Sequence, residues 1–294
     1  MKSGKLFDLA DVLDLMLDAV CVVDRDGRFL FVSAAFEQIF GYKPSEVLGK
    51  PMIDLVYPED RERTLSKVDT LLAGEPSPHF ENRWVRKDGR VVHVLWTAQW
   101  SEKHQARIAV AHDITERKKM EGRLQHLAVH DQLTNLPNRV LLQDRIATAL
   151  ASARRDSNQL ALLFIDLDGF KHVNDSCGHS VGDRLLQEVA RRLERCVRES
   201  DTVGRWGGDE FLVLLSSISA VSDAERVAEN IRLSLARPYN LNGELLNLAP
   251  SIGIAHYPEH GGGEQTLIQC ADHAMYKAKK AGGNRFLVYT SPAE

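Results

Sequence analysis

The chain is 294 residues long, which leaves room for two ordinary domains that each bury a core. Its formal net charge of -4 at pH 7 gives no electrostatic reason to expect nucleic-acid binding. No apolar stretch approaches membrane-spanning length and the four cysteines form no CxxC pair, so we expect a cytoplasmic protein with no membrane insertion, zinc knuckle or disulfide framework.

The first part of the chain mixes helical and strand-like segments. Residues 6–17 have amphipathic spacing that predicts a helix. Segments 19–23 and 28–32 flank a turn rich in Asp and Gly and predict a hairpin. Short helical pieces follow, and then three more strands are expected at 80–85, 90–99 and 106–112. This order predicts an α+β domain in which helices cover one side of an antiparallel sheet.

A charged segment over residues 116–128 separates the two halves of the chain. Met120, Leu124 and Leu127 stand at spacings of four and three, the seam spacing of a short two-helix coiled coil. On spacing alone, a single helix packed on its own domain explains the stripe equally well. Its place between two domains favours a dimeric signalling helix.

The second half alternates strands with amphipathic helices. Residues 161–165 form an apolar run that predicts a buried strand. Three helical stripes follow, the first through Leu185, Leu186, Val189, Leu193 and Val197, the second through Val227, Ala228, Ile231 and Leu235, and the third through Leu267, Ala271, Met275 and Ala278. These elements predict an α/β sandwich.

Two acidic segments suggest a site for a metal-bound nucleotide. Asp166, Asp168 and Lys171 follow the predicted buried strand, and a Gly207-Gly208-Asp209-Glu210 turn lies between two later strand-like segments. Carboxylates are the ligands that hard divalent cations prefer, and a lysine binds phosphate. Each segment alone is more simply explained as a solvated strand end or an ordinary hairpin. Together they favour a shared site, and Asp166 and Asp209 converge if the hairpin pairs beside the strand.

The second half resembles the bacterial GGDEF diguanylate cyclases over residues 130–289. The resemblance rests on several ordered motifs, among them Asp131-Gln132-Leu133-Thr134, Phe164-Ile165-Asp166-Leu167-Asp168, Gly207-Gly208-Asp209-Glu210-Phe211 and Ser251-Ile252-Gly253-Ile254-Ala255. The first half resembles a PAS sensor domain through Phe40-Gly41-Tyr42, Pro58-Glu59-Asp60, Lys87-Asp88-Gly89 and Asp113-Ile114-Thr115.

The two resemblances imply the organisation of the whole chain. A PAS domain with its N-terminal helix occupies residues 1–115, a signalling helix 116–129, and a GGDEF domain similar to nucleotidyl cyclase and palm folds 130–294. They imply a homodimeric, sensor-regulated diguanylate cyclase that condenses two GTP into cyclic di-GMP and two pyrophosphates.

The cyclase resemblance also implies roles for individual residues. Asp166, the Leu167 carbonyl and Asp209 would hold Mg²⁺, which Mn²⁺ can replace. Glu210 would lie near the attacking 3′-hydroxyl, and Lys171 would bind the phosphates and take part in catalysis. The remaining substrate-binding positions are the guanine readers Asn174 and Asp183, together with Phe170, Gly207, Gly208 and Lys279.

A product-binding site is implied by Arg198 and Asp201, an RxxD pair five residues before the signature, although RxxD alone is usually a surface ion pair. An alternative function is therefore a noncatalytic cyclic di-GMP receptor that uses this pair. A third possibility is that the PAS half is the functional unit and binds a partner through its helices. The intact signature favours the enzyme.

Two departures from the family pattern bear on the outcome. Pro250 enters an expected strand, so pairing there should begin after it or run along an edge. Gly283 replaces a family arginine that contacts the triphosphate, which would weaken GTP binding about tenfold unless Lys280 or Arg285 substitutes. A glycine after a helix is also an ordinary C-cap.

The ligand of the PAS half is left open by the sequence. Trp96 and Trp100 share one face of a regular strand, which is usually a core or interface feature. Four histidines, His79, His93, His104 and His112, include potential haem ligands, but isolated histidines are more often structural. A small metabolite, a flavin, haem or no ligand are all compatible with this sequence.

Overall fold

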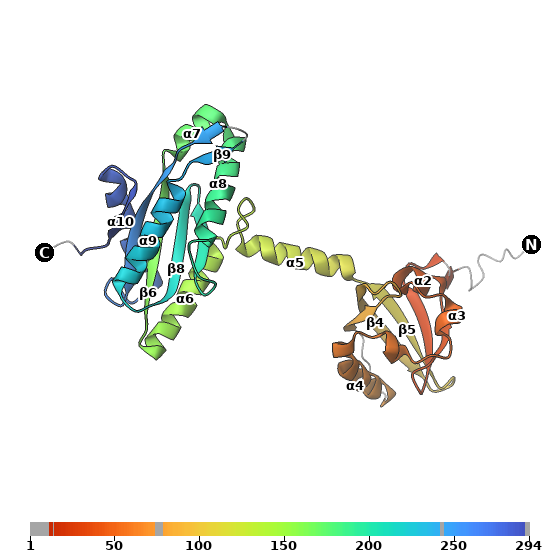
Figure 1. The fold of residues 1–294 in the computed structure, drawn as a ribbon. Coiled ribbons are helices and arrows are strands. Elements are labelled where there is room, and N and C mark those ends of the chain that lie inside the picture. Colours follow the sequence, from red (N-terminus) through yellow and green to blue (C-terminus); the bar gives the residue numbers. More distant parts are fainter. Residues whose placement is uncertain (1–11, 14, 74–78, 242–243, 292–294) are drawn as a thin grey trace, which may run out of the picture. The chain divides into compact units, whose positions relative to one another are not determined.

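The computed structural model describes residues 12–13, 15–73, 79–241 and 244–291. The chain divides into two compact units, Met1–Leu124 and Gln125–Glu294, and Figure 1 shows the elements of each. The helix expected over residues 6–17 lies mostly outside the described residues. Among the described helices, none has the length and apolar character needed to cross a bilayer.

The first unit is built on a five-stranded antiparallel sheet with the order β2-β1-β5-β4-β3. Its strands are β1 (Ala19–Asp24), β2 (Phe29–Val32), β3 (Phe80–Val85), β4 (Val91–Ser101) and β5 (Ala106–Asp113). Between β2 and β3 lie α2 (Ala34–Phe40), α3 (Pro44–Val47), the 3-10 turns η1 (Met52–Leu55) and η2 (Pro58–Asp60), and α4 (Arg61–Leu72). The structure confirms the antiparallel sheet and the order of its elements.

Aromatic side chains fill the core between this sheet and its helices. Phe36 and Phe40 of α2 pack at a centroid distance of 4.5 Å, and Phe40 lies 5.1 Å from Trp84 of β3. Trp84 in turn lies 5.0 Å from Trp96 of β4. Such contacts add to the burial of large apolar surfaces. Trp96 is therefore a core residue, as its place on the inward face of β4 predicts.

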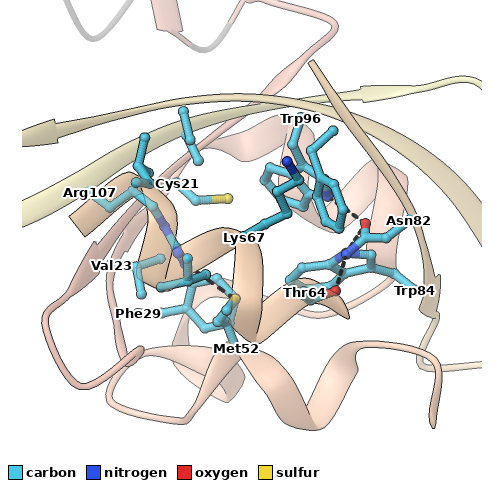
Figure 2. Close-up of a pocket in the computed structure, with 15 residues that line it drawn as sticks. Cys21, Val23, Phe29, Met52, Thr64, Lys67, Asn82, Trp84, Trp96 and Arg107 are labelled. Carbon is cyan, nitrogen blue, oxygen red and sulfur yellow. Dashed lines mark hydrogen bonds between the residues drawn. The ribbon is translucent and has the colours of Figure 1, made fainter. Parts of the chain in front are cut away.

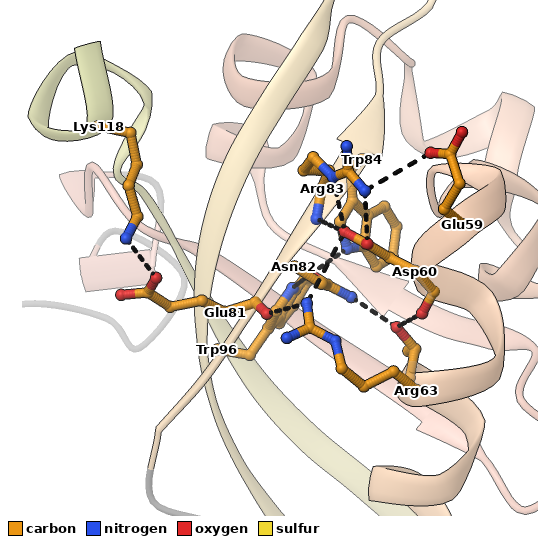
Figure 3. A network of polar contacts seen from close by, with 10 residues as sticks. Glu59, Asp60, Arg63, Glu81, Asn82, Arg83, Trp84, Trp96 and Lys118 are labelled. Carbon is orange, nitrogen blue, oxygen red and sulfur yellow. Dashed lines mark hydrogen bonds and ion pairs between the residues drawn. The ribbon is translucent and has the colours of Figure 1, made fainter. Parts of the chain in front are cut away.

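The edge strand β3 connects this core with the following helix (Figure 3). The Asn82 Oδ1 atom accepts hydrogen bonds from the Nε1 atoms of both Trp84 and Trp96, each at 2.9 Å. The preceding residue, Glu81, pairs at 2.7 Å with Lys118 in α5 (Thr115–Val129). Because successive strand residues face opposite sides, β3 presents one polar group to the core and the next to the helix.

Asp60 fixes β3 to η2. Its carboxylate accepts hydrogen bonds from the backbone N–H of Arg83 at 2.7 Å and from the Arg83 guanidinium at 2.8 Å (Figure 3). Asp60 is only 7% exposed, so these bonds satisfy a nearly buried charge.

The second unit is built on a five-stranded sheet with the order β12-β11-β6-β8-β7. Its strands are β6 (Gln159–Asp168), β7 (Thr202–Gly207), β8 (Glu210–Ile218), β11 (Ala249–Tyr257) and β12 (Arg285–Val288), and a separate two-stranded sheet holds β9 (Tyr239–Leu241) and β10 (Glu244–Leu246). Only the pairing of β11 with β12 in the main sheet is parallel.

Helices cover both faces of this sheet. They are α6 (Arg139–Asp156), α7 (Phe170–Cys177), α8 (His179–Glu194), α9 (Val221–Leu235) and α10 (Glu264–Lys280). Leu163 and Ile165 of β6 join a core with α8 and α9, whereas Leu162 and Phe164 join a second core with α6 and α10. The alternating side chains of β6 thus serve two cores, which confirms the predicted α/β sandwich.

The pairing of β11 differs in part from the expectation. Pro250 is the second residue of β11 and lies opposite Leu167 of β6, so pairing on that side begins before the proline. On the other side, pairing with β12 begins at Ser251. A proline lacks only the N–H, so a position at the start of a strand with one unpaired flank tolerates it.

Candidate functional site

The carboxyl end of β6 and the β7–β8 hairpin bring the two acidic segments together. Asp166 lies opposite Glu210 in the antiparallel pairing of β6 with β8. Gly207 pairs with Glu210, so Gly208 and Asp209 form the turn. Gly208 has a φ of +53°, a backbone conformation that favours glycine. The glycines of the motif thus allow a tight turn that holds its acids beside Asp166.

These acids lie close enough to oppose one another's ionisation. Burial and the neighbouring Asp166 charge raise the pKa of both Asp209 and Glu210. Burial also raises the pKa of Asp272 on α10, and Asp166 adds to the rise. A nearby cation favours the ionised form of such neighbouring carboxyl groups.

Lys279 supplies one such cation from α10. Its Nζ atom lies 2.6 Å from Asp166 Oδ1. Burial tends to lower the pKa of Lys279, but the hydrogen bond and charge of Asp166 outweigh it and raise that pKa. The resemblance implied a substrate-binding role for Lys279. In the structure it pairs with Asp166, one of the proposed metal ligands.

A glycine on β11 permits the close approach of α10. A Cβ atom on Gly253 would lie 2.0 Å from the Ala271 carbonyl oxygen and 2.1 Å from the Met275 nitrogen. The backbone of α10 therefore packs directly on Gly253, the residue of β11 that pairs with Phe164 of β6. This contact helps to set the distance of Lys279 from β6.

Asp168 is occupied by structural partners. Its Oδ1 atom accepts from the Ser251 hydroxyl at 2.8 Å, and its Oδ2 atom accepts from the Asn284 backbone N–H at 3.0 Å. A Cβ atom on Gly283 would lie 2.4 Å from Asp168 Oδ2. Asp168 thus ties the loop after α10 to β6.

Gly283 itself completes the C-terminal cap of α10. Its N–H donates to the Ala278 carbonyl at 3.1 Å, while the Gly282 N–H donates to the Lys279 carbonyl at 3.2 Å. Both glycines have positive φ, +106° at Gly282 and +69° at Gly283. This is the Schellman pattern of a helix end, so the C-cap explanation of the glycine fits the structure.

The predicted guanine readers lie on two helices that pack against each other, α7 and α8. Asn174 lies in α7 and Asp183 in α8. A Cβ atom on Gly182 would lie 1.9 Å from Asn174 Oδ1 and 3.3 Å from Phe170, so only glycine admits this contact. Asp183 follows Gly182 directly and is exposed, as is Lys171 in the first turn of α7.

The predicted product-binding pair forms a turn before β7. The Asp201 carboxylate accepts from the Arg198 backbone N–H at 3.1 Å, and the Asp201 N–H donates to the Arg198 carbonyl at 3.0 Å. The Arg198 side chain is exposed. Asp201 therefore shapes the turn while Arg198 faces solvent.

Arg205 is a site-supporting residue to which the sequence gave no role. Its guanidinium donates to the Gly208 carbonyl at 2.9 and 2.7 Å and to Asp131 at 3.0 Å. Asp131 also accepts from the backbone and hydroxyl of Thr134. The pairing of Asp131 with Arg205 connects the motif that begins at Asp131 with the strand that leads into the Gly-Gly-Asp-Glu turn. The sequence alone does not indicate this pairing, because the two residues lie far apart along the chain.

The donor set fits a hard divalent cation bound together with a substrate. Among the described residues, the only trio of His, Cys, Asp or Glu ligand atoms within 4.8 Å is His256, Glu259 and His260, at the opposite end of β11. Asp166 and Asp209 therefore do not form a closed all-protein cage. Mg²⁺ typically binds through one or two carboxylates and completes its shell with water and substrate phosphates.

Comparisons with known proteins identify both halves of the chain. The model of the diguanylate cyclase GGDEF domain matches residues 128–285, and that of the PAS fold matches residues 8–114. Diguanylate cyclase TpbB of Pseudomonas aeruginosa is 47% identical over 166 residues, which cover 56% of this chain and 38% of TpbB. The GGDEF domain structure of TpbB aligns with a TM-score of 0.54 at 44% identity, covering 55% of this chain and 94% of that one.

Two further relatives extend the comparison. Diguanylate cyclase DgcM of Escherichia coli is 35% identical over 269 residues, which cover 90% of this chain and 63% of DgcM. The coiled coil and GGDEF domain of DgcB from Caulobacter crescentus, solved with c-di-GMP, has a TM-score of 0.54 at 28% identity and covers 60% of this chain and 92% of that one. The chain thus spans less than two thirds of the curated relatives TpbB and DgcM. From these matches, the chain belongs to the diguanylate cyclase GGDEF family and carries a PAS domain before the GGDEF domain.

Proposed function

We propose that this chain is a diguanylate cyclase that joins two GTP molecules into cyclic di-GMP and releases two pyrophosphates. The observation that carries the proposal is the intact Gly-Gly-Asp-Glu turn, whose Asp209 and Glu210 lie beside Asp166. In each transfer a 3′-hydroxyl attacks the α-phosphorus of the partner nucleotide. This chemistry needs alignment and charge neutralisation more than a protein nucleophile.

The acidic end of β6 is the proposed metal site. Asp166, Asp209 and the Leu167 carbonyl would hold Mg²⁺, or Mn²⁺ in its place. When bound, the ion neutralises charge on the phosphates and on the leaving pyrophosphate. Lys279, which pairs with Asp166 at 2.6 Å, would turn from the carboxylate to the triphosphate as substrate binds. Lys171 and the backbone near Phe170 would contact the same phosphates.

Base selection is assigned to Asn174 and Asp183. A carboxylate accepts from both the N1–H and the exocyclic amine of guanine, whereas adenine presents an acceptor at N1. ATP would therefore leave the Asp183 charge without a donor. The packing of Asn174 on Gly182 supports this assignment because Gly182 is the residue directly before Asp183.

The reaction requires two copies of the chain, since each GGDEF domain is proposed to bind one GTP. Glu210 would lie nearest the attacking hydroxyl. The exposure of α5 supports a proposed dimer, because an uncovered apolar stripe can pack against a second copy. Met120 and Leu124 are 65% and 66% exposed, and no residue of α5 is buried. In this proposal α5 also passes the state of the PAS domain to the cyclase, and Arg198 with Asp201 binds the product and inhibits the enzyme.

The proposal is tested by giving the purified chain GTP with Mg²⁺ and identifying the product by chromatography and mass spectrometry. We expect cyclic di-GMP, with a specific activity that rises with protein concentration through the dimerisation range. Asp209→Asn and Glu210→Gln should each lower turnover roughly a hundredfold or more. Asp156→Asn, which changes an exposed acid at the end of α6, is the matched control and should retain normal turnover.

Failure to form cyclic di-GMP at concentrations where the chain is dimeric would remove the enzyme proposal. Binding of cyclic di-GMP without turnover would instead support a noncatalytic receptor. Near-normal rates in Asp209→Asn or Glu210→Gln would show that the chemistry lies elsewhere.

A further inference from the structure

The PAS unit contains a cavity between its sheet and α4 (Figure 2). Its volume is about 60 Å³. The walls are mostly apolar and aromatic, formed by residues that include Val23, Phe29, Leu71, Trp84 and Trp96. A cavity of this size lies between one that holds a single water and one of about 150 Å³ that holds benzene.

Arg107 introduces a charge into this apolar space (Figure 2). It belongs to β5, where Ala109 and Ala111 on the same face are buried in the core. Arg107 is itself 7% exposed. Its position on the inward face of a strand is one that sequences normally fill with an apolar residue.

The residues described by the structure supply Arg107 with no counter-ion. Its guanidinium donates to the Met52 Sδ atom at 3.3 Å, and a thioether is a weak acceptor. No carboxylate pairs with Arg107 among the residues that the structure describes. An arginine stays protonated in proteins, so this buried charge lacks an anion.

The other polar groups of the cavity do not take that role. Burial raises the pKa of Cys21 to about 12, although Arg107 opposes the rise, so its thiol is neutral. Asn82 accepts from the two tryptophans, and its amide donates to Thr64 Oγ1 at 2.9 Å. Lys67 is exposed and adds a second positive charge at the cavity.

We propose that the PAS cavity binds a short apolar carboxylate. The carboxylate would lie against Arg107, whose planar guanidinium matches two carboxylate oxygens. The hydrocarbon part would contact Phe29, Trp84 and Trp96. The cavity is smaller than the one that holds benzene, so the carboxylate and its nearest carbons would fill it, and the outer carbons of an acid of about three to five carbons would lie in its opening beside the exposed Lys67. A neutral molecule of the same shape would leave the buried charge unpaired and bind more weakly.

The cavity walls argue against the larger ligands considered from the sequence. None of His79, His93, His104 and His112 belongs to the lining. Pockets for drug-sized ligands measure about 300–1,000 Å³, several times this volume. Haem and flavin therefore do not fit the cavity in this conformation.

The first experiment uses the full chain without GTP, so its result does not depend on cyclase activity. Isothermal titration calorimetry would measure acetate, butanoate and hexanoate, the neutral butanamide, and inorganic phosphate as an anion without an apolar part. Tryptophan fluorescence provides a second signal because Trp84 and Trp96 line the cavity. We expect saturable binding of butanoate, at least tenfold tighter than that of butanamide or phosphate. Equal binding of butanamide, equal binding of phosphate, or no binding of any carboxylate would overturn the proposal.

The second experiment removes the charge. Arg107→Met should abolish the preference for butanoate over butanamide, and circular dichroism would verify its fold. Arg90→Met changes an exposed arginine of the same unit that pairs with Asp88, and should keep the wild-type preference. A wild-type preference in folded Arg107→Met would refute the role of the guanidinium. If that variant does not fold, the carboxylate and amide comparison on the unchanged chain still decides the proposal.

Discussion

At the scale of single residues, Arg198 combines an ordered backbone with an exposed side chain. Asp201 fixes the turn through the Arg198 N–H, while the guanidinium faces solvent. If this pair binds product, Arg198→Ala should raise the cyclic di-GMP concentration for half-inhibition about tenfold, as expected from the loss of a charge-assisted contact. The initial rate should change little. Inhibition curves would measure this, with Arg191→Ala as an exposed control on α8. Identical curves for Arg198→Ala and wild type would refute the assignment.

At Gly283 the structure favours one of the two explanations left open by the sequence, the helix C-cap. The sequence suggested that an arginine there would complete the phosphate site. Its φ of +69° and the 2.4 Å approach of a Cβ to Asp168 instead oppose any side chain. We predict that Gly283→Arg lowers the free energy of unfolding by about 1–3 kcal/mol and does not lower the KM for GTP. Thermal unfolding and steady-state kinetics measure the two effects.

Gly283→Ala separates backbone strain from charge. It should destabilise the chain about as much as Gly283→Arg, because both place a Cβ against Asp168. A stable Gly283→Arg with a clearly lower KM for GTP would show that Asp168 moves aside and that the original phosphate-site interpretation was right.

Asp60 provides a pH-dependent contribution to stability. Its hydrogen bond to the Arg83 side chain outweighs burial and holds the pKa of Asp60 below its usual range. A lowered pKa in the folded state stabilises the fold above the unfolded pKa of about 3.9, and this contribution disappears as pH falls through the folded value. Asp60→Asn should therefore lower the thermal midpoint of the PAS unit at pH 7, by an amount that shrinks below about pH 4. A difference that stays constant between pH 7 and pH 3 would contradict this origin.

At the scale of secondary-structure elements, α5 has an apolar stripe that is exposed among the residues that the structure describes. Met120, Leu124 and Leu127 are 65%, 66% and 36% exposed. If a second α5 covers them, replacing all three by Gln should weaken the dimer and lower turnover together. Light scattering and a turnover assay would measure these effects across protein concentrations.

The control for this change is Lys119→Gln, an exposed position on the same helix whose side chain pairs with Glu116. It should leave both association and turnover unchanged. An intact dimer with normal turnover in the triple variant would exclude the α5 stripe as a dimer seam.

Several elements were predictable because their patterns have a single physical explanation. The apolar run in β6 is buried on both faces and begins the acidic site at its end. The stripes of α8, α9 and α10 largely match their buried residues, except that Val197 lies beyond the end of α8 and Val227 of α9 is only partly buried. Asp166 and Asp209 were expected to converge if the hairpin paired with β6, and β8 does pair with it.

Other features depend on tertiary contacts that no local pattern contains. In β5 the apolar residue Ile108 is 45% exposed, while the charged residue Arg107 is buried. The alternation of side chains in this strand would therefore predict that the opposite face is buried. The Arg205 contact with Asp131 joins residues 74 positions apart. A side chain added at Gly283, in the loop after α10, would likewise clash with Asp168 at the end of β6.

At the scale of the whole molecule, a PAS unit and a GGDEF-family unit share one continuous helix. The boundary between the two compact units falls inside α5, after Leu124. A change that begins in the PAS cavity must therefore reach α5 through the sensor unit's own contacts. Within the described residues, Glu81 provides two of these contacts, since it pairs with Arg117 and Lys118 at 2.7 Å each.

The adjacency of Glu81 and Asn82 in β3 restricts how that change can occur. One planar peptide group joins them, so neither backbone position moves without the other. A ligand that reorients Trp84 or Trp96 must either break the hydrogen bonds to Asn82 or displace this strand. Within its sheet β3 pairs with β4, and its other edge is held by the Val56–Trp84 bridge and by the backbone bonds of Arg83 to Tyr57 and Asp60, so a shift of β3 would also strain these contacts. Filling the cavity would then act on α5 through β3, whose Glu81 holds the helix by its two ion pairs.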